Sequence, residues 1–300
     1  MDDLRAACAT VAEQALHVHV VADAIETAYA IDRPVATPDL PTTRDVDREP
    51  LAARWLTLDA VNFGSGWFPT VRKRPGLSGA RTIAAALDER FEARGPWSAE
   101  ELIRLNAGTL APILGQDPGH ELIALYAASL NDLGEQLRAH HGGSFAAALD
   151  AAGGSAVTLA RMLGGWPCFA DRSKLHGIEL PFLKRAQIAA ADLHRAGAAR
   201  FADLHRLTMF ADNLVPHVLR LDGVLRFAPA LVARIERGEL IAHGSREEIE
   251  IRACAVHAVE LLVRAGAGTS AVVLDQALWQ RGQLPRYKAT PRHRSRCTGY

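Results

Sequence analysis

The sequence predicts a mainly α-helical protein. Ala, Leu, Arg and Glu dominate most of its 300 residues, and apolar residues recur every three to four positions, which is the period of an amphipathic helix. Alternating runs of β-branched residues, which would indicate strands, are scarce. A chain of this length is expected to form one large domain, or two small ones that share a core.

The expected elements of the first third follow from this periodicity. A first helix is predicted over about residues 3–30, which makes His17 and His19 ordinary helix residues. The Pro- and Asp-rich residues up to 50 suit a surface loop. Residues 55–79 combine aromatic, glycine and basic residues without a helical period, so we expect an irregular segment there and the first ligand contacts.

The remaining helices have clearer boundaries. Ser98 and Glu101 have the spacing of a capping box, so a helix is expected to begin there. Further helices are expected over 118–140, on either side of Gly153 and Gly154, as a helix–turn–helix over 181–222, and as a last pair over 245–266 and 269–281.

Composition and motifs exclude several classes of function. The 34 Lys and Arg equal the 34 Asp and Glu, which argues against binding of long duplex nucleic acid. The chain contains no P-loop, no dinucleotide-binding glycine motif, no serine-hydrolase elbow and no HExxH zinc motif. No window approaches the roughly 20 apolar residues of a membrane-spanning helix, and the N-terminus does not look like a signal peptide. We therefore expect a cytoplasmic protein with no membrane partner.

The cysteines give no sign of a metal centre. Cys8, Cys168, Cys254 and Cys297 are scattered along the chain, without the spacing of metal ligands or of a disulfide framework. We expect reduced thiols and no bound metal.

Asp212 is the strongest candidate for chemistry. It lies within an apolar stripe over 207–219, and Pro216 suits the first turn of a helix that would begin near Asn213. The positive end of that helix dipole would favour the ionised carboxylate. A capping or salt-bridged aspartate explains the same local pattern, and the pattern alone favours this structural interpretation.

A second candidate is the pair Lys184 and Arg185. Pro181 suits the first position of a helix, which places both cations in the first turn, where they oppose the helix dipole. Either an acidic neighbour such as Asp192 or Glu179 compensates them, or an anionic ligand does. The compensated surface is the favoured interpretation.

Two further charged groups are ambiguous. Glu248 and Arg252 lie four residues apart in the order that stabilises an exposed helix face, worth roughly 0.3 kcal/mol, so a structural surface pair is expected. The tail contains Arg292, Arg294 and Arg296 beside His293 and could hold a phosphate, although a short basic tail is more often solvated or faces nucleic acid.

Several segments together resemble the queuosine salvage family of queuosine 5′-phosphate N-glycosylases. They occur in the family's order and cover roughly residues 50–300, so the expected organisation is a single domain over 1–300, with an N-terminal helix and loop in 1–50 and the family core in 51–300. The matching segments are LDAVNF (58–63), LPFLKRAQIAAADL (180–193), LTMFAD with VPHVL (207–219), GELIAHGSREEIEIRACAVHAVELL (238–262) and the closing HRSRC with Tyr300.

The resemblance implies a helical fold related to helix-hairpin-helix DNA glycosylases that acts on a free nucleotide without a metal or organic cofactor. The implied reaction is hydrolysis of queuosine 5′-monophosphate to queuine and ribose 5-phosphate. The resemblance also makes Asp212 the catalytic carboxylate, and a carboxylate suits this reaction because cleavage of an N-ribosidic bond builds positive charge on the sugar. The resemblance also implies that Lys184 contacts the substrate. We further expect Arg185, Asn62, Phe63, Trp67, His217 and Arg296 to bind substrate, with Phe63, Trp67 and Phe68 available for stacking on the base.

One departure from the family pattern leaves the base open. The family motif NFCFW is replaced here by Asn62 and Phe63 followed by Gly64, Ser65, Gly66 and Trp67. Two glycines are expected to loosen the backbone and to move the second aromatic residue. The alternatives are therefore another 7-deazaguanine or modified nucleotide as substrate, or a non-catalytic binder of modified nucleosides or tRNA. A DNA-acting glycosylase is disfavoured by the neutral charge balance.

Overall fold

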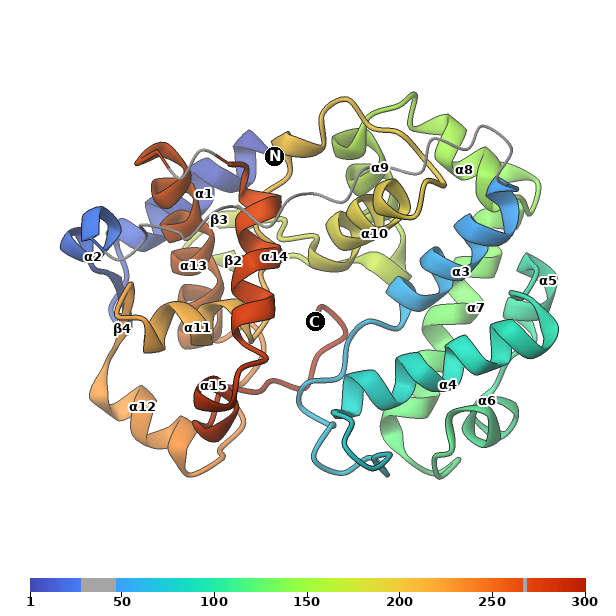
Figure 1. The fold of residues 1–300 in the computed structure, drawn as a ribbon, viewed down its shortest axis with the longest axis horizontal. Coiled ribbons are helices and arrows are strands. Elements are labelled where there is room, and N and C mark those ends of the chain that lie inside the picture. The colour runs from blue at the N-terminus through green and yellow to red at the C-terminus, as the bar shows by residue number, and fades with distance from the viewer. Residues whose placement is uncertain (28–46, 267–268) are drawn as a thin grey trace.

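This computed structural model describes residues 1–27, 47–266 and 269–300. These residues contain fifteen α-helices and four short strands (Figure 1). The prediction of a mainly α-helical fold is confirmed. The relation to helix-hairpin-helix DNA glycosylases stays a prediction.

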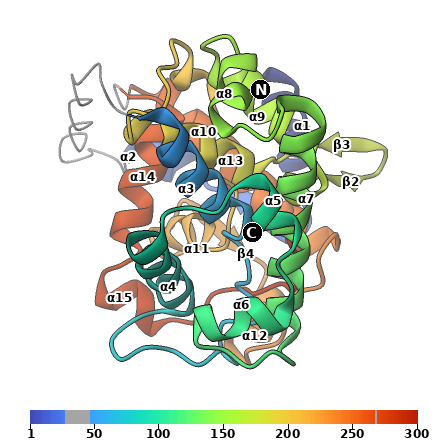
Figure 2. The ribbon, with the colours of Figure 1, turned by 90° about the vertical axis from the view of Figure 1, so that its right-hand side faces the viewer.

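The helices form two groups, and the C-terminal tail passes between them (Figure 1). One group contains α1 (Asp2–Glu13), α2 (Ala22–Thr27), α11 (Val215–Leu221), α12 (Pro229–Glu236), α13 (Arg246–Arg264), α14 (Ala271–Arg281) and α15 (Pro285–Ala289). The other contains α3 (Arg48–Ala60), α4 (Gly79–Arg94), α5 (Ala99–Ile103), α6 (Ala107–Leu114), α7 (Glu121–His141), α8 (Phe145–Ala151), α9 (Ala156–Leu163) and α10 (Lys184–Arg195). Figure 2 shows α4, α6 and α7 of this second group from the right-hand side of Figure 1.

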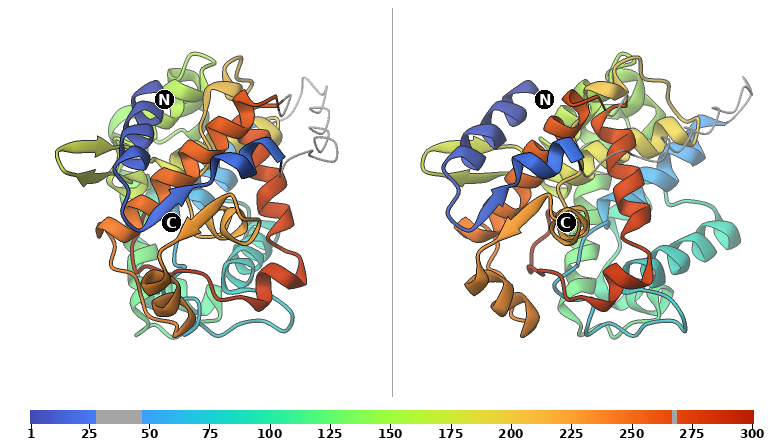
Figure 3. Two further views of the ribbon diagram at one scale, coloured as in Figure 1. Left: turned by 90° about the vertical axis from the view of Figure 1, so that its left-hand side faces the viewer. Right: turned by 60° about the vertical axis from the view of Figure 1, so that its left-hand side comes forward.

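The strands form two antiparallel pairs. β1 (Val18–Val20) pairs with β4 (Leu225–Phe227), and β2 (Ser173–Leu175) forms a projecting hairpin with β3 (Ile178–Leu180) (Figure 3). Two single 3₁₀ turns, η1 (Pro167–Phe169) and η2 (Leu204–Arg206), complete the regular elements of the described ranges.

Helix α13 is the centre of the first group. It packs against α1, α11, α14 and β1, so side chains around its whole circumference are buried (Figure 3). The prediction that Glu248 and Arg252 lie on an exposed helix face is therefore wrong, because both side chains are fully buried.

The N-terminal region differs most from expectation. The helix predicted over 3–30 ends at Glu13, and β1 follows, so His19 lies in a strand and His17 directly before it. The backbone N–H groups of Leu16, His17 and Val18 donate to the buried carboxylate of Glu250, over 3.0, 2.6 and 3.2 Å. In a continuous helix these N–H groups would donate to backbone carbonyls four residues earlier, and Glu250 of α13 accepts them instead. Most of the loop expected up to residue 50 lies outside the described residues, and α3 already begins at Arg48.

Most later elements match their predictions. The capping box of Ser98 and Glu101 is present, and the helices expected over 118–140, around Gly153 and Gly154, and over 245–281 are observed as α7, α8, α9, α13 and α14. The irregular segment begins later than expected, because residues 55–60 belong to α3.

The helix expected from Pro181 begins instead at Lys184. Leu183, which precedes it, has a positive φ of 49°. The helix begins there because Asp171, from a distant loop, accepts the backbone N–H groups of Leu183 and Lys184.

All four cysteines are buried free thiols. Within the described ranges, no three His, Cys, Asp or Glu side chains are grouped as a metal site. None of the described helices combines the length and the hydropathy of a membrane-spanning segment.

Candidate functional site

A cavity of about 610 Å³ lies between the two helix groups. Its walls come from the irregular segment after α3, from α10, from the residues before α11, from α14 and from the C-terminal tail. It brings together four of the predicted site residues, Asn62, Phe63, Lys184 and Asp212, which are far apart in the sequence. The volume is in the range of small-molecule binding sites.

Asp212 is held rigidly at the cavity wall. Its Oδ1 accepts the backbone N–H groups of Leu214, at 2.8 Å, and Val215, at 3.0 Å, so this carboxylate starts α11. The helix begins at Val215, close to the predicted start near Asn213, but Asn213 does not cap it, because its side-chain amide donates to the backbone oxygen of His293. Oδ2 of Asp212 accepts no hydrogen bond from the described residues. One oxygen is therefore structural, and the other remains for a ligand.

Lys184 is a buried cation in the same cavity. Its Nζ donates to the backbone oxygen of Asn62 at 3.0 Å and approaches Asn62 Oδ1 at 3.4 Å. Burial lowers the pKa of Lys184, and the negative charge of Asp212 opposes this effect. The acidic neighbours proposed from the sequence have other partners: Asp192 pairs with Arg195 and Glu179 pairs with Lys174.

Asp275 is a cavity residue that the sequence analysis missed. It lies in α14, is almost fully buried, and its Oδ1 accepts the backbone N–H of Phe210 at 2.9 Å. Burial and the nearby charge of Asp212 raise the pKa of Asp275 well above its usual range. The signal that could have identified it is the one used for Asp212, a single aspartate within an apolar helical stretch.

The basic tail contributes two cations to the cavity, Arg292 and Arg294. Arg294 donates to the backbone oxygen of Gly238 at 3.1 Å. The guanidinium of Arg292 is half-buried and forms no hydrogen bond or ion pair with the part of the chain that the structure describes. Burial lowers its pKa, and the charge of Asp212 opposes that shift. Arg292 is thus a partly desolvated cation without a protein partner in the described ranges.

Four residues predicted to bind substrate do not line the cavity. Arg185 is fully buried behind Phe63, with its guanidinium carbon 4.9 Å from the ring centroid and its Nη1 donating to the Ala60 oxygen at 2.6 Å. The ring of His217 is buried at 2.9 Å from the Tyr287 oxygen.

Trp67 and Arg296 are the other two. Trp67 is buried and donates its indole N–H to Glu121 at 2.7 Å, while Arg296 lies over the Trp67 ring and pairs with the same carboxylate at 3.3 Å. Phe68 lines the cavity in place of Trp67.

The Gly64–Gly66 turn is ordered rather than loose. The Gly64 N–H donates to the Tyr300 oxygen, and the Gly64 oxygen accepts the N–H groups of Trp67 and Phe68. A Cβ atom on Gly66 would lie 2.4 Å from the backbone oxygen of Ser295, so this glycine allows the turn to contact the tail. The expectation that the glycines loosen the backbone is wrong.

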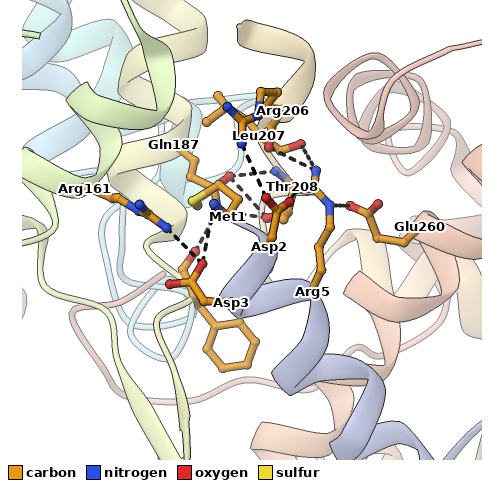
Figure 4. A network of polar contacts seen from close by, with 11 residues as sticks. Met1, Asp2, Asp3, Arg5, Arg161, Gln187, Arg206, Leu207, Thr208 and Glu260 are labelled. Atoms are coloured by element: carbon orange, nitrogen blue, oxygen red, sulfur yellow. Dashed lines mark hydrogen bonds and ion pairs between the residues drawn. The ribbon is translucent and has the colours of Figure 1, made fainter.

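The segment that leads to Asp212 is tied to the N-terminus and to α10 (Figure 4). Arg5 donates to the backbone oxygens of Arg206 and Leu207 at 3.0 and 3.1 Å. Thr208 and the buried Gln187 of α10 exchange hydrogen bonds of 2.9 Å. These contacts fix the backbone on the N-terminal side of Asp212.

Comparisons with known proteins identify the family. The model of the family described as queuosine salvage protein matches residues 44–300. A protein of Sphaerobacter thermophilus named queuosine 5′-phosphate N-glycosylase/hydrolase is 37% identical over 266 residues, which cover 84% of this chain and 82% of that protein. Proteins of the same name from Mus musculus and Bos taurus are each 33% identical, over 57% of this chain and 56% of their own length. The chain belongs to the queuosine salvage protein family.

Proposed function

We propose that this protein hydrolyses the N-glycosidic bond of queuosine 5′-monophosphate and releases queuine and ribose 5-phosphate. The observation that supports this most strongly is the carboxylate of Asp212, which is anchored through Oδ1 in a cavity that also contains Arg292. Among the described residues, neither Oδ2 of Asp212 nor the guanidinium of Arg292 has a hydrogen-bond partner. The three relatives compared above have names that specify this substrate and this bond type.

Asp212 suits the transition state of this reaction. As the bond between C1′ and the base nitrogen breaks, its electron pair leaves with the base, and positive charge develops on C1′ and the ring oxygen. A preorganised carboxylate stabilises this charge more than it stabilises the neutral ground state. The two backbone N–H groups that hold Oδ1 keep the carboxylate in place, so little reorganisation is needed when the charge develops.

The balance of atoms requires one water molecule. The water oxygen bonds to C1′, and one of the water protons goes to the released base. Oδ2 of Asp212 is the group that orients or deprotonates this water molecule. Queuine has carbon where a purine has N7, which closes the usual site for protonating the departing base. More of the barrier must therefore be lowered by charge stabilisation and positioning, which is the contribution assigned to Asp212.

The remaining cavity residues suit the other parts of a nucleotide. Arg292 has a guanidinium available for a 5′-phosphate, and Lys184 adds a second positive charge to the same cavity. The aromatic rings of Phe63 and Phe68 line the wall and can stack on a flat base. We propose that the protein acts in the cytoplasm and that its substrate is a free nucleotide. The formal net charge of zero argues against duplex nucleic acid as the substrate.

The test is to incubate the purified protein with queuosine 5′-monophosphate and to separate free queuine and ribose 5-phosphate by chromatography. Queuosine without its phosphate, a second 7-deazaguanine nucleotide and guanosine 5′-monophosphate serve as comparison substrates. Faster release from another 7-deazaguanine nucleotide would reassign the base. Salt-sensitive tRNA binding with no base release would contradict the enzyme and favour a non-catalytic binder.

A further inference from the structure

A buried ion pair lies behind the cavity wall. Arg252 of α13 and Asp171 are both fully buried, with the Nη2 of Arg252 2.6 Å from Oδ2 of Asp171. Neither residue lines the cavity. Because a buried ion pair loses much of its attraction to the cost of desolvation, stability alone is a weak explanation for its presence.

The pair is bonded to the backbone next to both charged site residues. Nε of Arg252 donates to the backbone oxygen of Ala211, the residue before Asp212, at 2.9 Å. Oδ2 of Asp171 accepts the backbone N–H of Lys184 at 2.9 Å. A single ion pair therefore connects the segment that carries Asp212 to the first residue of α10.

The shape of the arginine side chain is needed for these contacts. Its guanidinium carbon lies 4.0 Å from the centroid of Phe182 and 4.6 Å from that of Tyr300, and Tyr300 lines the cavity. Nη1 is 3.6 Å from the carboxylate of Glu248. The planar guanidinium group of Arg252 donates to the backbone oxygen of Ala211 and to the carboxylate of Asp171 at the same time. The single ammonium group of lysine cannot make both hydrogen bonds in this geometry.

We propose that Arg252 and Asp171 are positioning residues that set the place of the Asp212 carboxylate relative to Lys184. Neither touches the substrate. The kinetic part of this inference rests on the proposed hydrolysis of queuosine 5′-monophosphate, whereas the structural part concerns the backbone at residues 211–215 and does not.

Arg252→Lys is the variant that tests this proposal. It retains a positive charge beside Asp171 but loses the Nε–H donor to Ala211. We expect kcat per folded molecule to fall by about tenfold to a hundredfold, because a small displacement of a catalytic group has effects of this size. KM should change less than about threefold, since the cavity residues are unchanged. Hydrogen exchange at the amides of Leu214 and Val215 should accelerate by about tenfold, the effect of losing one hydrogen bond.

Glu250→Gln is the matched control. Glu250 is fully buried in the same helix, and its hydrogen bonds go to residues 16–18 and to Arg246, not to the cavity wall. We expect this variant to lower the thermal midpoint while leaving kcat per folded molecule and the exchange at Leu214 and Val215 as in the wild type.

The two parts of the experiment separate the possible failures. If Arg252→Lys is merely less stable, with wild-type kcat and wild-type exchange at Leu214 and Val215, the positioning role is overturned while the enzymatic function stands. If the wild type releases no base, the proposed function fails, and the exchange measurement alone decides about the positioning role. If Arg252→Lys does not fold, Asp171→Asn, which keeps the shape of the side chain, is measured by the same criteria.

Discussion

Replacement of Asp212 by Asn is the sharpest test of the proposed chemistry. Asn keeps an oxygen that can accept the N–H groups of Leu214 and Val215, so the start of α11 is preserved. The stability loss should stay below about 1 kcal/mol, the typical cost of weakening a helix cap. The variant removes the negative charge while leaving the shape of the cavity wall intact.

The expected loss of rate follows from Coulomb's law. A carboxylate about 4 Å from the developing positive charge contributes roughly 4 kcal/mol at an effective dielectric constant of about 20. This energy corresponds to a decrease of about a thousandfold in the rate of base release. Binding of the nucleotide should change much less, because the carboxylate acts mainly on a charge that is absent from the ground state.

The assay is base release in a single turnover at saturating queuosine 5′-monophosphate, with nucleotide affinity measured separately by calorimetry. Asp203→Asn is the matched control, because Asp203 also caps a helix, accepting the Ala156 N–H at 2.6 Å, but lies outside the cavity. It should release base at the wild-type rate. Retention by Asp212→Asn of more than about a tenth of the wild-type rate would refute the electrostatic role of Asp212.

Further predictions concern substrate binding, pH and packing. Arg292→Gln should raise KM by about tenfold to a hundredfold for the nucleotide, as expected for one lost charge-assisted bond, and leave the KM of the unphosphorylated nucleoside unchanged. Burial raises the pKa of Asp275 in the folded state, so the free energy of unfolding should decrease as pH rises through that pKa. Urea titrations at several pH values should show a smaller decrease for Asp275→Asn than for the wild type. For His217, burial lowers the pKa to about 4, so stability falls as pH drops from about 6.5 to that value; His217→Gln should weaken this dependence, and an unchanged slope would contradict the assignment. Gly66→Ala should cost about 1–3 kcal/mol of stability through overlap with the backbone oxygen of Ser295, visible as a lower thermal midpoint.

Local periodicity was sufficient to predict most of the helices, and it failed where a partner distant in sequence decides the backbone. Strand β1 forms because its residues pair with Leu225–Phe227 and because Glu250 accepts hydrogen bonds from the amides of Leu16, His17 and Val18 at its start. The start of α10 is decided by Asp171, which no pattern around Pro181 could indicate.

The site could be predicted only in part. Asp212 and Lys184 stood out as charged residues in unusual local settings, and both line the cavity. Arg185 and His217 lie in the same motifs but point into the packed interior, because a motif does not specify which face of a helix meets the cavity. Arg252 was interpreted as a surface residue, since an i, i+4 charge pair looks the same on an exposed helix and on one that is covered on all sides.

The three carboxyl groups that line the cavity differ in environment, and this difference singles out Asp212. Asp192 pairs with Arg195 at 2.7 Å, and burial raises the pKa of Asp275, which disfavours its charged form. Asp212 forms no ion pair with the described residues, and its negative charge opposes the lowering of the pKa values of Lys184 and Arg292 by burial. Pairs of carboxyl groups with opposed environments commonly divide their chemical roles. Because burial disfavours a charge on Asp275 and Arg195 pairs with Asp192, Asp212 is the lining carboxylate that we expect to face the positive charge developed in the proposed reaction.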